Sequence, residues 1–298
     1  MRPGLADQAA GAGHATGPPG RGIVWRMLDS TLTLAVIGSG TMGEAIMRGL
    51  LASGKLQPAQ IVATDRRAEV VAHVRATHGV RATTSNVEAC RDATVVLLAV
   101  KPHEVAAVVD SDEMRRLLAG KLVISIAAGV RLSQLTGWLP ASAVIRAMPN
   151  TPCLIGEGMT VIARGTGVTD AQAGVAMEIF RAVGRAIEMD DKLMDAVTSL
   201  NGSGPAFAYV FLEAMCDGAV RMGLRRDAAM EIAAQMFQGA ARMVLQTGQH
   251  PAALKDQVTT PAGCTIAGLL TMEDGRIRSV IARAVEEAAV VAGKLGQG

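Results

Sequence analysis

The amino-acid sequence predicts an α/β protein in which a doubly wound parallel sheet is followed by an all-α domain. From Thr31 onward, short β-branched runs alternate with alanine-rich helical stretches, which is the pattern of a parallel α/β sheet. Beyond Thr169, the pattern is helical to the C-terminus. We therefore expect a disordered extension over residues 1–30, a sheet domain over residues 31–165 and a helical domain over residues 166–298.

The expected strands are short and apolar, as strands are when helices cover both faces of a sheet. In chain order they are Leu34–Ile37, Ile61–Thr64, Val95–Val100, Leu122–Ile126 and Ala143–Ala147, with a further extended run at Met159–Ala163. Glu44–Leu50 is expected to form a helix after the first strand. In the second domain, Thr169 and Gln172 form a capping box that starts a helix. Glycine and proline predict helix breaks near Gly202–Pro205, Gly248–Pro251, Pro261 and Gly275.

One expected helix of the second domain begins after Pro205 and carries few charges. Its apolar residues surround it instead of forming one stripe, and they are Phe207, Tyr209, Val210, Phe211, Leu212, Met215, Val220 and Met222. Such a helix must be buried on all sides. In so small a domain the simplest partner is the same segment of another subunit, which predicts a homodimer or a larger homo-oligomer. The alternative is the central helix of a monomeric bundle.

Composition excludes several classes of protein. The 298 residues include 29 basic and 27 acidic side chains, a net charge of +2, and only four Phe, two Trp and one Tyr, so no surface for nucleic acid is expected. Apolar stretches such as Thr94–Val100 are far shorter than the roughly 18 residues of a membrane span. Four widely spaced cysteines without a C-x-x-C pair favour a reducing cytoplasm, and no histidine spacing predicts a metal site.

The first 30 residues are rich in Gly, Ala and Pro and lack the apolar segment of a signal peptide. A transit peptide is the alternative, since Arg2, Arg21 and Arg26 are present, but Asp7 and Asp29 argue against the amphipathic helix that it needs.

A glycine-rich loop follows the first strand directly and opens the first helix. It reads Gly38-Ser39-Gly40-Thr41-Met42-Gly43. Gly38 permits a tight turn, Gly40 has no Cβ to block a pyrophosphate, and Gly43 lets helix and strand pack closely. The free N–H groups of the helix N-terminus attract phosphates. The loop predicts a dinucleotide-binding Rossmann domain, against the alternative of a plain glycine-rich connector.

The end of the second strand bears on the choice of cofactor. Asp65 follows Gly43 by 22 residues. An acidic side chain there bonds a ribose 2′-hydroxyl and favours NAD, whereas Arg66 or Arg67 would pair with a 2′-phosphate and favour NADP. If Asp65 turns toward an arginine, its repulsion of the phosphate is lost. We expect both cofactors to work, with NADPH preferred somewhat over NADH.

Two further strand ends should meet the cofactor, because ligands of doubly wound sheets lie at the carboxyl ends of strands. Ala99-Val100-Lys101-Pro102 closes one strand with a turn, and Ile126-Ala127-Ala128 closes the next with small residues that a flat nicotinamide ring can approach. Taken alone, Lys101 is more typical of a solvated loop lysine than of a catalytic one. A Pro-Asn-Thr-Pro turn at residues 149–152 comes directly after another strand and is expected to cross between the domains.

The segment from Leu254 to Leu269 contains the candidate anion site of the helical half. Thr259 or Thr260 is expected to cap a helix with Pro261 in its first turn, so that residues 262–265 present backbone N–H groups. Such an N-terminus binds anions, and the hydroxyls of Thr260 and Thr265 would point at the ligand. A plain capped helix is the alternative.

Five sequence blocks occur in order between Thr31 and Gly293. They are A-V-K-P at Ala99–Pro102, A-A-G-V at Ala127–Val130, R-x-M-P-N-T-P at Arg146–Pro152, G-S-G-P-A at Gly202–Ala206 and L-K-D-x-V-x-x-P-x-G-x-T at Leu254–Thr265. With these blocks the chain resembles the pyrroline-5-carboxylate reductases, which make proline. The resemblance implies a Rossmann domain for NADP(H), with NAD(H) as a second possibility, and a helical domain that interlocks with its partner in a homodimer or larger assembly.

The resemblance also implies roles for single residues. The cofactor would lie on Ile37–Met42, on Asp65 at the ribose, on Asn86 near the adenine side, and on Ala99–Pro102 and Ile126–Ala128 toward the nicotinamide; the loop and the charges add Gly43 and Arg66 to the expected cofactor residues. The substrate carboxylate would lie on the turn from Thr260 to Thr265, with Gly263, Cys264 and Gln257 nearby, and Thr265 would approach the ring nitrogen as the catalytic hydroxyl. Many relatives have an uncharged residue in place of Asp65 and some have Asn in place of Gln257, which are two departures of this chain.

Imine reduction needs less of the protein than ketone reduction, because a protonated iminium is already electrophilic. Related hydroxyacid dehydrogenases place a catalytic Lys four residues after a glycine. Ala208 stands at that spacing from Gly204, and no Lys or His occurs from Leu193 to Val220, which favours imine over alcohol chemistry. The expected reaction is reduction of 1-pyrroline-5-carboxylate to L-proline; the alternatives are a reductase for a related cyclic imino acid, such as a six-membered one, and a non-catalytic NADP-sensing dimer.

Overall fold

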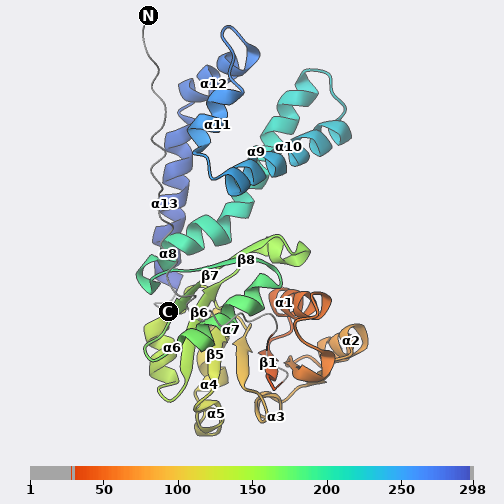
Figure 1. Ribbon diagram of the computed structural model, residues 1–298, viewed down its shortest axis with the longest axis vertical. Coiled ribbons are helices and arrows are strands. Elements are labelled where there is room, and N and C mark those ends of the chain that lie inside the picture. The colour runs from red at the N-terminus through yellow and green to blue at the C-terminus, as the bar shows by residue number, and fades with distance from the viewer. Residues whose placement is uncertain (1–27, 29–30, 296–298) are drawn as a thin grey trace, which may run out of the picture.

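The structure is a computed structural model, and it describes residues 28 and 31–295. Its sheet domain holds an eight-stranded sheet in the order β3-β2-β1-β4-β5-β6-β7-β8 (Figure 1). The strands are β1 Leu34–Ile37, β2 Ile61–Thr64, β3 Arg81–Thr83, β4 Val95–Leu98, β5 Leu122–Ser125, β6 Ala143–Met148, β7 Gly158–Arg164 and β8 Gly184–Glu188. β1 to β6 run parallel, β7 is antiparallel to β6, and β8 is parallel to β7. The strand order reverses between β1 and β4, so the carboxyl ends of these two strands flank the crevice in which ligands of such sheets bind.

Helices cover both faces of this sheet (Figure 1). They are α1 Thr41–Ala52, α2 Ala68–His78, α3 Asn86–Cys90, α4 Pro102–Val109, α5 Asp112–Leu118, α6 Leu132–Trp138 and α7 Asp170–Arg181, with short 3-10 turns at Pro58–Gln60 and η2 Thr151–Ile155. Strands β1, β2, β4 and β5 are buried along their whole length, which confirms the expectation of strands covered on both faces. The capping box of Thr169 and Gln172 starts α7 as predicted.

Two strands were absent from the sequence prediction. β3 is a three-residue edge strand without a long apolar run. β8 lies in the segment predicted to be helical only, so that prediction is wrong for residues 184–188. Three of the five residues of β8 are exposed, and its apolar content is low because it forms the sheet edge and pairs on one side with β7.

The hydrophobic core lies on the two faces of the sheet. Leu28 belongs to the first of these clusters and is buried. The disorder expected for residues 1–30 otherwise falls outside the described residues.

The helical half extends away from the sheet as two limbs (Figure 1). A continuous helical run passes from α8 Met194–Val197 through the π-helix η4 Thr198–Ser203 into α9 Gly204–Arg221, and α10 Arg226–Thr247 packs back on α9. The break expected at Gly202–Pro205 is therefore wrong, because Pro205 lies in the first turn of α9 where its missing N–H is tolerated. The second limb holds α11 Pro251–Gln257, α12 Cys264–Asp274 and α13 Ile277–Leu295, and α13 packs on α8 and η4.

Helix α9 is not buried within one chain. Cys216 is its one buried residue, whereas Tyr209, Val210, Met215 and Met222 are 48–80% exposed. The alternative of a central helix in a monomeric bundle is thus wrong, and the apolar surface remains for another copy to cover. Within residues 28 and 31–295, the structure contains no helix with the length and apolar character needed to span a membrane.

Candidate active site

The glycine loop forms the tight turn that its sequence predicts. Gly38 has a φ of +95°, and a Cβ there would lie 2.7 Å from the carbonyl oxygen of Ala99. A Cβ on Gly43 would lie 2.2 Å from the carbonyl oxygen of Gly38, so α1 meets the loop at a distance that excludes a side chain. A Cβ on Gly40 would meet no atom within 4 Å. Gly40 is also the N-cap of α1, where no side chain caps the helix, so this open space faces free backbone N–H groups that favour a phosphate.

A cleft of about 1090 Å³ runs along the carboxyl ends of the strands. It brings together nearly all the residues predicted for the cofactor: Ile37, Gly38, Gly40, Thr41, Met42, Asp65, Arg66, Asn86, Ala99, Val100, Lys101, Pro102, Ile126, Ala127 and Ala128. Two predicted residues do not line it. Ser39 is buried with its hydroxyl donating to the carbonyl of Thr64 at 3.0 Å, and Gly43 is buried in α1.

Asp65 is turned toward Arg67 at the end of β2. Its Oδ1 accepts from the backbone N–H of Arg67 at 3.0 Å and from Nε at 2.9 Å, and its Oδ2 accepts from Nη2 at 3.2 Å. Burial pushes the pKa of Asp65 upward, but the hydrogen bonds from Arg67 outweigh it and leave the pKa below its ordinary value. The carboxylate is therefore ionised and neutralised by an arginine at the position where a ribose is expected.

The cleft extends past Asn86 into a region that the sequence analysis did not predict. Asn86 begins α3 and accepts a hydrogen bond on Oδ1 from the hydroxyl of Thr64 at 2.7 Å. Beyond it, α3, α4 and α5 contribute Val87, His103, Ala107, Val108, Ser111 and Met114 to the wall. These side chains are ordinary core and surface types in the sequence. The capping signature of Ser111, whose hydroxyl accepts from the N–H of Met114, marks the start of α5 there.

The opposite wall is held by two asparagines. Met148, Pro149, Asn150 and Thr151 line the cleft together with Gly202 of η4. Asn201 donates through Nδ2 to the carbonyl oxygens of Met148 at 2.8 Å and Met159 at 3.0 Å, and it accepts from Nδ2 of Asn150 at 3.0 Å. A Cβ on Gly202 would lie 2.5 Å from Cε of Met148. The predicted Pro-Asn-Thr-Pro turn therefore joins the sheet domain to the helical half.

The candidate anion site is the turn from Thr260 to Thr265, called the anion turn below. The helix that follows it begins at a different residue from the one predicted. Helix α12 begins at Cys264 with Gly263 as its N-cap, so the prediction that Thr259 or Thr260 caps it and that Pro261 lies in its first turn is wrong. The chain turns sharply before the helix: Ala262 has a φ of +56°, and the N–H of Gly263 donates to the carbonyl of Thr260 at 3.1 Å. A Cβ on Gly263 would lie 2.4 Å from Oγ1 of Thr260. Only glycine leaves room for that hydroxyl beside the helix N-terminus.

Within one chain, this turn does not reach the cleft. Helices α11 and α12 lie at the end of the helical limb remote from the sheet (Figure 1). The predicted substrate residues Thr260, Gly263, Cys264 and Thr265 are therefore together with each other but apart from the predicted cofactor residues. Gln257, the last residue of α11, hydrogen-bonds through Nε2 to Oε1 of Gln249 at 2.8 Å.

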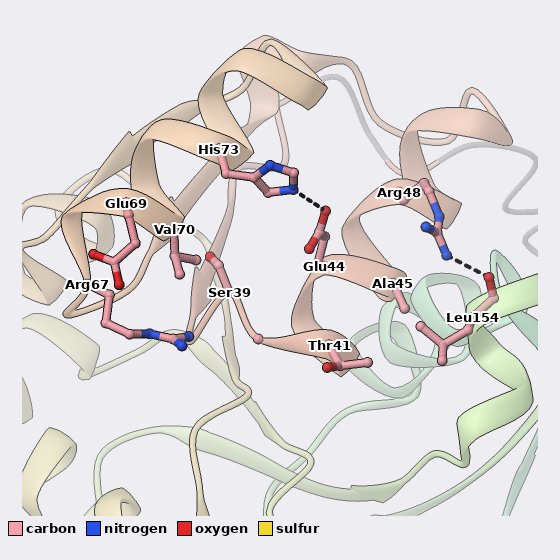
Figure 2. Close-up of a pocket in the computed structure, with 11 residues that line it drawn as sticks. Ser39, Thr41, Glu44, Ala45, Arg48, Arg67, Glu69, Val70, His73 and Leu154 are labelled. Atoms are coloured by element: carbon pink, nitrogen blue, oxygen red, sulfur yellow. Dashed lines mark hydrogen bonds and ion pairs between the residues drawn. The ribbon is translucent and has the colours of Figure 1, made fainter.

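A second hollow, of about 470 Å³, lies between α1 and α2 beside the glycine loop (Figure 2). Glu44 crosses it and contacts His73 at 3.2 Å and the more deeply buried His78 at 3.0 Å. The hydrogen bond from His78, with a smaller one from His73, holds the pKa of Glu44 below its ordinary value although burial opposes it. On the far side, Arg48 donates to the carbonyl oxygen of Leu154 at 2.6 Å. These contacts fix α1 against its neighbours.

Comparison with known proteins identifies relatives across nearly the whole chain. A family model described as pyrroline-5-carboxylate reductase dimerisation matches residues 191–295, and one described as NADP oxidoreductase coenzyme F420-dependent matches residues 33–129. The pyrroline-5-carboxylate reductase of Methanosarcina acetivorans is 42% identical over 89% of this chain and 98% of its own length, and that of Arabidopsis thaliana is 40% identical over 88% and 94%.

Solved structures agree with these relatives. A pyrroline-5-carboxylate reductase from Coxiella burnetii superposes with a TM-score of 0.84 at 34% identity, covering 89% of this chain and 98% of that chain. The Plasmodium falciparum pyrroline carboxylate reductase with NADP bound has a TM-score of 0.79 at 28% identity, with the same coverage.

Proposed function

The chain belongs to the pyrroline-5-carboxylate reductase family, and we propose that its reaction takes place where the cleft of one copy meets the anion turn of a second copy. It reduces 1-pyrroline-5-carboxylate to L-proline with NAD(P)H, the last step of proline biosynthesis. The observation that carries this function is identity of about 40% to reductases of that name over almost the whole chain. The cofactor is NADP(H), and the cleft along the strand ends is where a dinucleotide fits.

The loop from Gly38 to Gly40 and the N-terminus of α1 would hold the pyrophosphate. The fit rests on Gly40, because the open space at its missing Cβ faces N–H groups that no side chain caps. Ala99–Pro102 and Ile126–Ala128 would lie toward the nicotinamide, and Val87, Val108 and Met114 offer an apolar wall for the adenine. When bound, NAD(P)H supplies the hydride that the imine carbon accepts.

The chain's own part in the reaction is binding, orientation and exclusion of water. A protonated imine needs no acid to stabilise a developing alkoxide. The turn from Thr260 to Thr265 would bind the substrate carboxylate through its N–H groups, and the hydroxyl of Thr265 would orient the ring nitrogen or relay a proton to it. The rest of the rate enhancement comes from holding the imine carbon close to the hydride donor.

Because the anion turn and the cleft lie apart within one chain, we propose that a complete site forms between two copies. The helical half is the part that matches the dimerisation family, and its apolar side chains are exposed in the single chain. A second copy covering those side chains would bring an anion turn toward a cleft.

The prediction divides the chain at residue 165, although β8 continues the sheet beyond that point. Four free thiols support a cytoplasmic location.

The turned Asp65 supports a preference for NADPH over NADH. A carboxylate that is paired with Arg67 neither reaches a 2′-hydroxyl freely nor repels a 2′-phosphate strongly. We expect kcat/KM to be higher with NADPH than with NADH. A tenfold or greater advantage for NADH would contradict this preference.

One assay tests the substrate. Purified protein is mixed with NADPH and either pyrroline-5-carboxylate or its six-membered analogue, and nucleotide oxidation is followed by absorbance. We expect turnover with the five-membered imine to dominate. Faster turnover of the six-membered imine would favour the related-imine alternative, and binding of NADPH without turnover of either imine would favour the sensor.

A further inference from the structure

Two ion pairs lie along the wall of the cleft. Their arginines, Arg66 and Arg67, are adjacent in sequence and follow β2. Arg67 pairs with Asp65 as described above. Arg66 pairs through Nη1 with Oε1 of Glu104 at 3.1 Å. Glu104 lies in the first turn of α4, so the second pair spans from the β2–α2 connection to the helix on the other side of the cleft. All four residues line the cleft.

The two pairs differ in burial and in bonding. The side chain of Asp65 is 9% exposed and accepts hydrogen bonds from Arg67 on both oxygens. The side chain of Arg66 is 83% exposed and meets Glu104 through one guanidinium nitrogen. Exposed pairs of this kind are weak, since water and salt screen them and two long side chains must be held still. The Arg66–Glu104 pair is therefore the one that exchanges partners easily.

A 2′-phosphate would meet a locally neutral set of charges here. The formal charges of Asp65, Arg66, Arg67 and Glu104 cancel, while a phosphate monoester brings a charge of about −1.5 to −2. A guanidinium is the side chain best matched to a phosphate, and it must leave its carboxylate partner to bind one. Arg67 is held by Asp65 through both carboxylate oxygens, so Arg66 is the arginine available for exchange.

We propose that Glu104 is a specificity-determining residue that weakens the chain's discrimination in favour of NADP(H), because it competes with the 2′-phosphate for Arg66. This inference rests on the proposed position of the dinucleotide in the cleft. NAD(H) has no 2′-phosphate, so the competition acts on NADP(H) alone. Glu104 thus accounts for the expectation that one site accepts both cofactors with only a moderate preference for NADP(H).

The Glu104→Gln variant separates this role from a structural one. In addition to Arg66, Glu104 accepts a hydrogen bond on Oε2 from the N–H of Lys101 at 3.2 Å, which starts α4. Glutamine keeps an oxygen for that N–H while removing the charge that holds Arg66. Glu69→Gln is the matched control, because Glu69 is exposed in the first turn of α2 and contributes a charge beside Arg67 without contacting Arg66.

Calorimetric titration with NADP⁺ and with NAD⁺ measures the effect without any imine. We expect Glu104→Gln to raise the ratio of NADP⁺ to NAD⁺ affinity by roughly two- to fivefold, the range of an exposed ion pair. In an Arg66→Ala background, the same substitution should leave the ratio unchanged, as a double-mutant cycle requires for a direct pair. Glu69→Gln should shift the ratio less than Glu104→Gln does.

An unchanged ratio in Glu104→Gln, a gain that persists without Arg66, or an equal gain in Glu69→Gln would each overturn the role of Glu104. These results would leave the proposed function standing, because wild-type nucleotide binding is measured in the same experiment. Failure of the wild-type chain to bind either nucleotide would overturn both.

Discussion

Nδ2 of Asn150 donates to Oδ1 of Asn201 at 3.0 Å, and this contact joins the turn after β6 to the π-helix that leads into α9. Each asparagine also hydrogen-bonds to the backbone of the strands beside it. Oδ1 of Asn150 accepts from the N–H of Met159 at 2.9 Å, and Nδ2 of Asn201 donates to the carbonyl oxygens of Met148 and Met159. Buried backbone groups need such partners. The pair therefore fixes one wall of the cleft and the direction in which the helical half leaves the sheet.

Replacement of Asn201 by Ala should destabilise the fold. It removes one donor from each of the carbonyl oxygens of Met148 and Met159, which we expect to lower the free energy of unfolding by about 1–3 kcal/mol. Denaturant unfolding measures this value. Ser203→Ala in the same π-helix is the control and should cost less than half as much. Equal losses in the two variants would contradict the role of the asparagine pair.

Replacement of Thr265 by Ala should affect catalysis more than cofactor binding. Loss of a hydroxyl that orients the substrate should lower kcat/KM for the imine by about 10- to 100-fold, the effect of one hydrogen bond to a charged group. The dissociation constant of NADPH should stay close to that of the wild type. Thr271→Ala on the same helix is the control, because its hydroxyl donates to the carbonyl of Ala267. Normal turnover in Thr265→Ala would remove Thr265 from the mechanism.

Replacement of Arg67 by Ala should shift the cofactor preference toward NADH. Asp65 loses both side-chain donors, so its carboxylate becomes free to bond a 2′-hydroxyl and to repel a 2′-phosphate. We expect the ratio of kcat/KM for NADPH to that for NADH to fall by about tenfold or more. Arg81→Ala removes the same charge from an exposed position on β3 and should change the ratio little. A ratio that rises in Arg67→Ala would show that Asp65 does not act on the phosphate.

A charge on the exposed face of α9 should prevent assembly. Val210 is 64% exposed in the single chain, and a buried glutamate at that position would be costly in an interface between two helical halves. Light scattering after size-exclusion chromatography should show a smaller species for Val210→Glu than for the wild type. Ala76→Glu, at an exposed position of α2, should keep the wild-type mass. If Val210→Glu retains that mass, α9 is not part of the interface.

Glu44 should contribute stability that is lost in acid. Its pKa in the folded chain lies below the ordinary value of 4.5, so the folded state binds fewer protons than the unfolded state there. The contribution is present above that ordinary value and disappears as pH falls through the folded pKa. Glu44→Gln should therefore cost about 1 kcal/mol near neutral pH and progressively less below about pH 4. A constant cost across this range would contradict the contribution; Glu113→Gln, on an exposed helix position, is the control.

The sequence predicted the parts of the site that depend on local chain geometry. The run from Leu34 to Gly43 contains its own strand, turn and helix start, and glycine is favoured locally by the positive φ at Gly38 and by the contact of Gly43 with the carbonyl oxygen of Gly38. Strands β4 and β5 end just before Ala99 and Ile126, and the sequence predicts these ends because each strand is a short apolar run. For the same reason, 15 of the 17 cofactor residues predicted from sequence line one cleft.

Other features depended on pairs of residues that are distant in sequence or in a second copy. β8 is a strand because it pairs with β7, although its composition is not that of a buried strand. Asp65 is compatible with both cofactor interpretations in the sequence, and only the tertiary structure shows that its carboxylate is paired with Arg67.

By itself, then, the sequence determined the order of the central strands, the glycine loop and the family to which the chain belongs. The tertiary structure decided the orientation of Asp65, the contact of Asn150 with Asn201, the start of α12 at Cys264 and the separation of the anion turn from the cleft. The physical reason is that local preferences fix backbone conformation over a few residues. Charge pairing, burial and the position of one helical half against a sheet arise only when segments far apart in the chain meet.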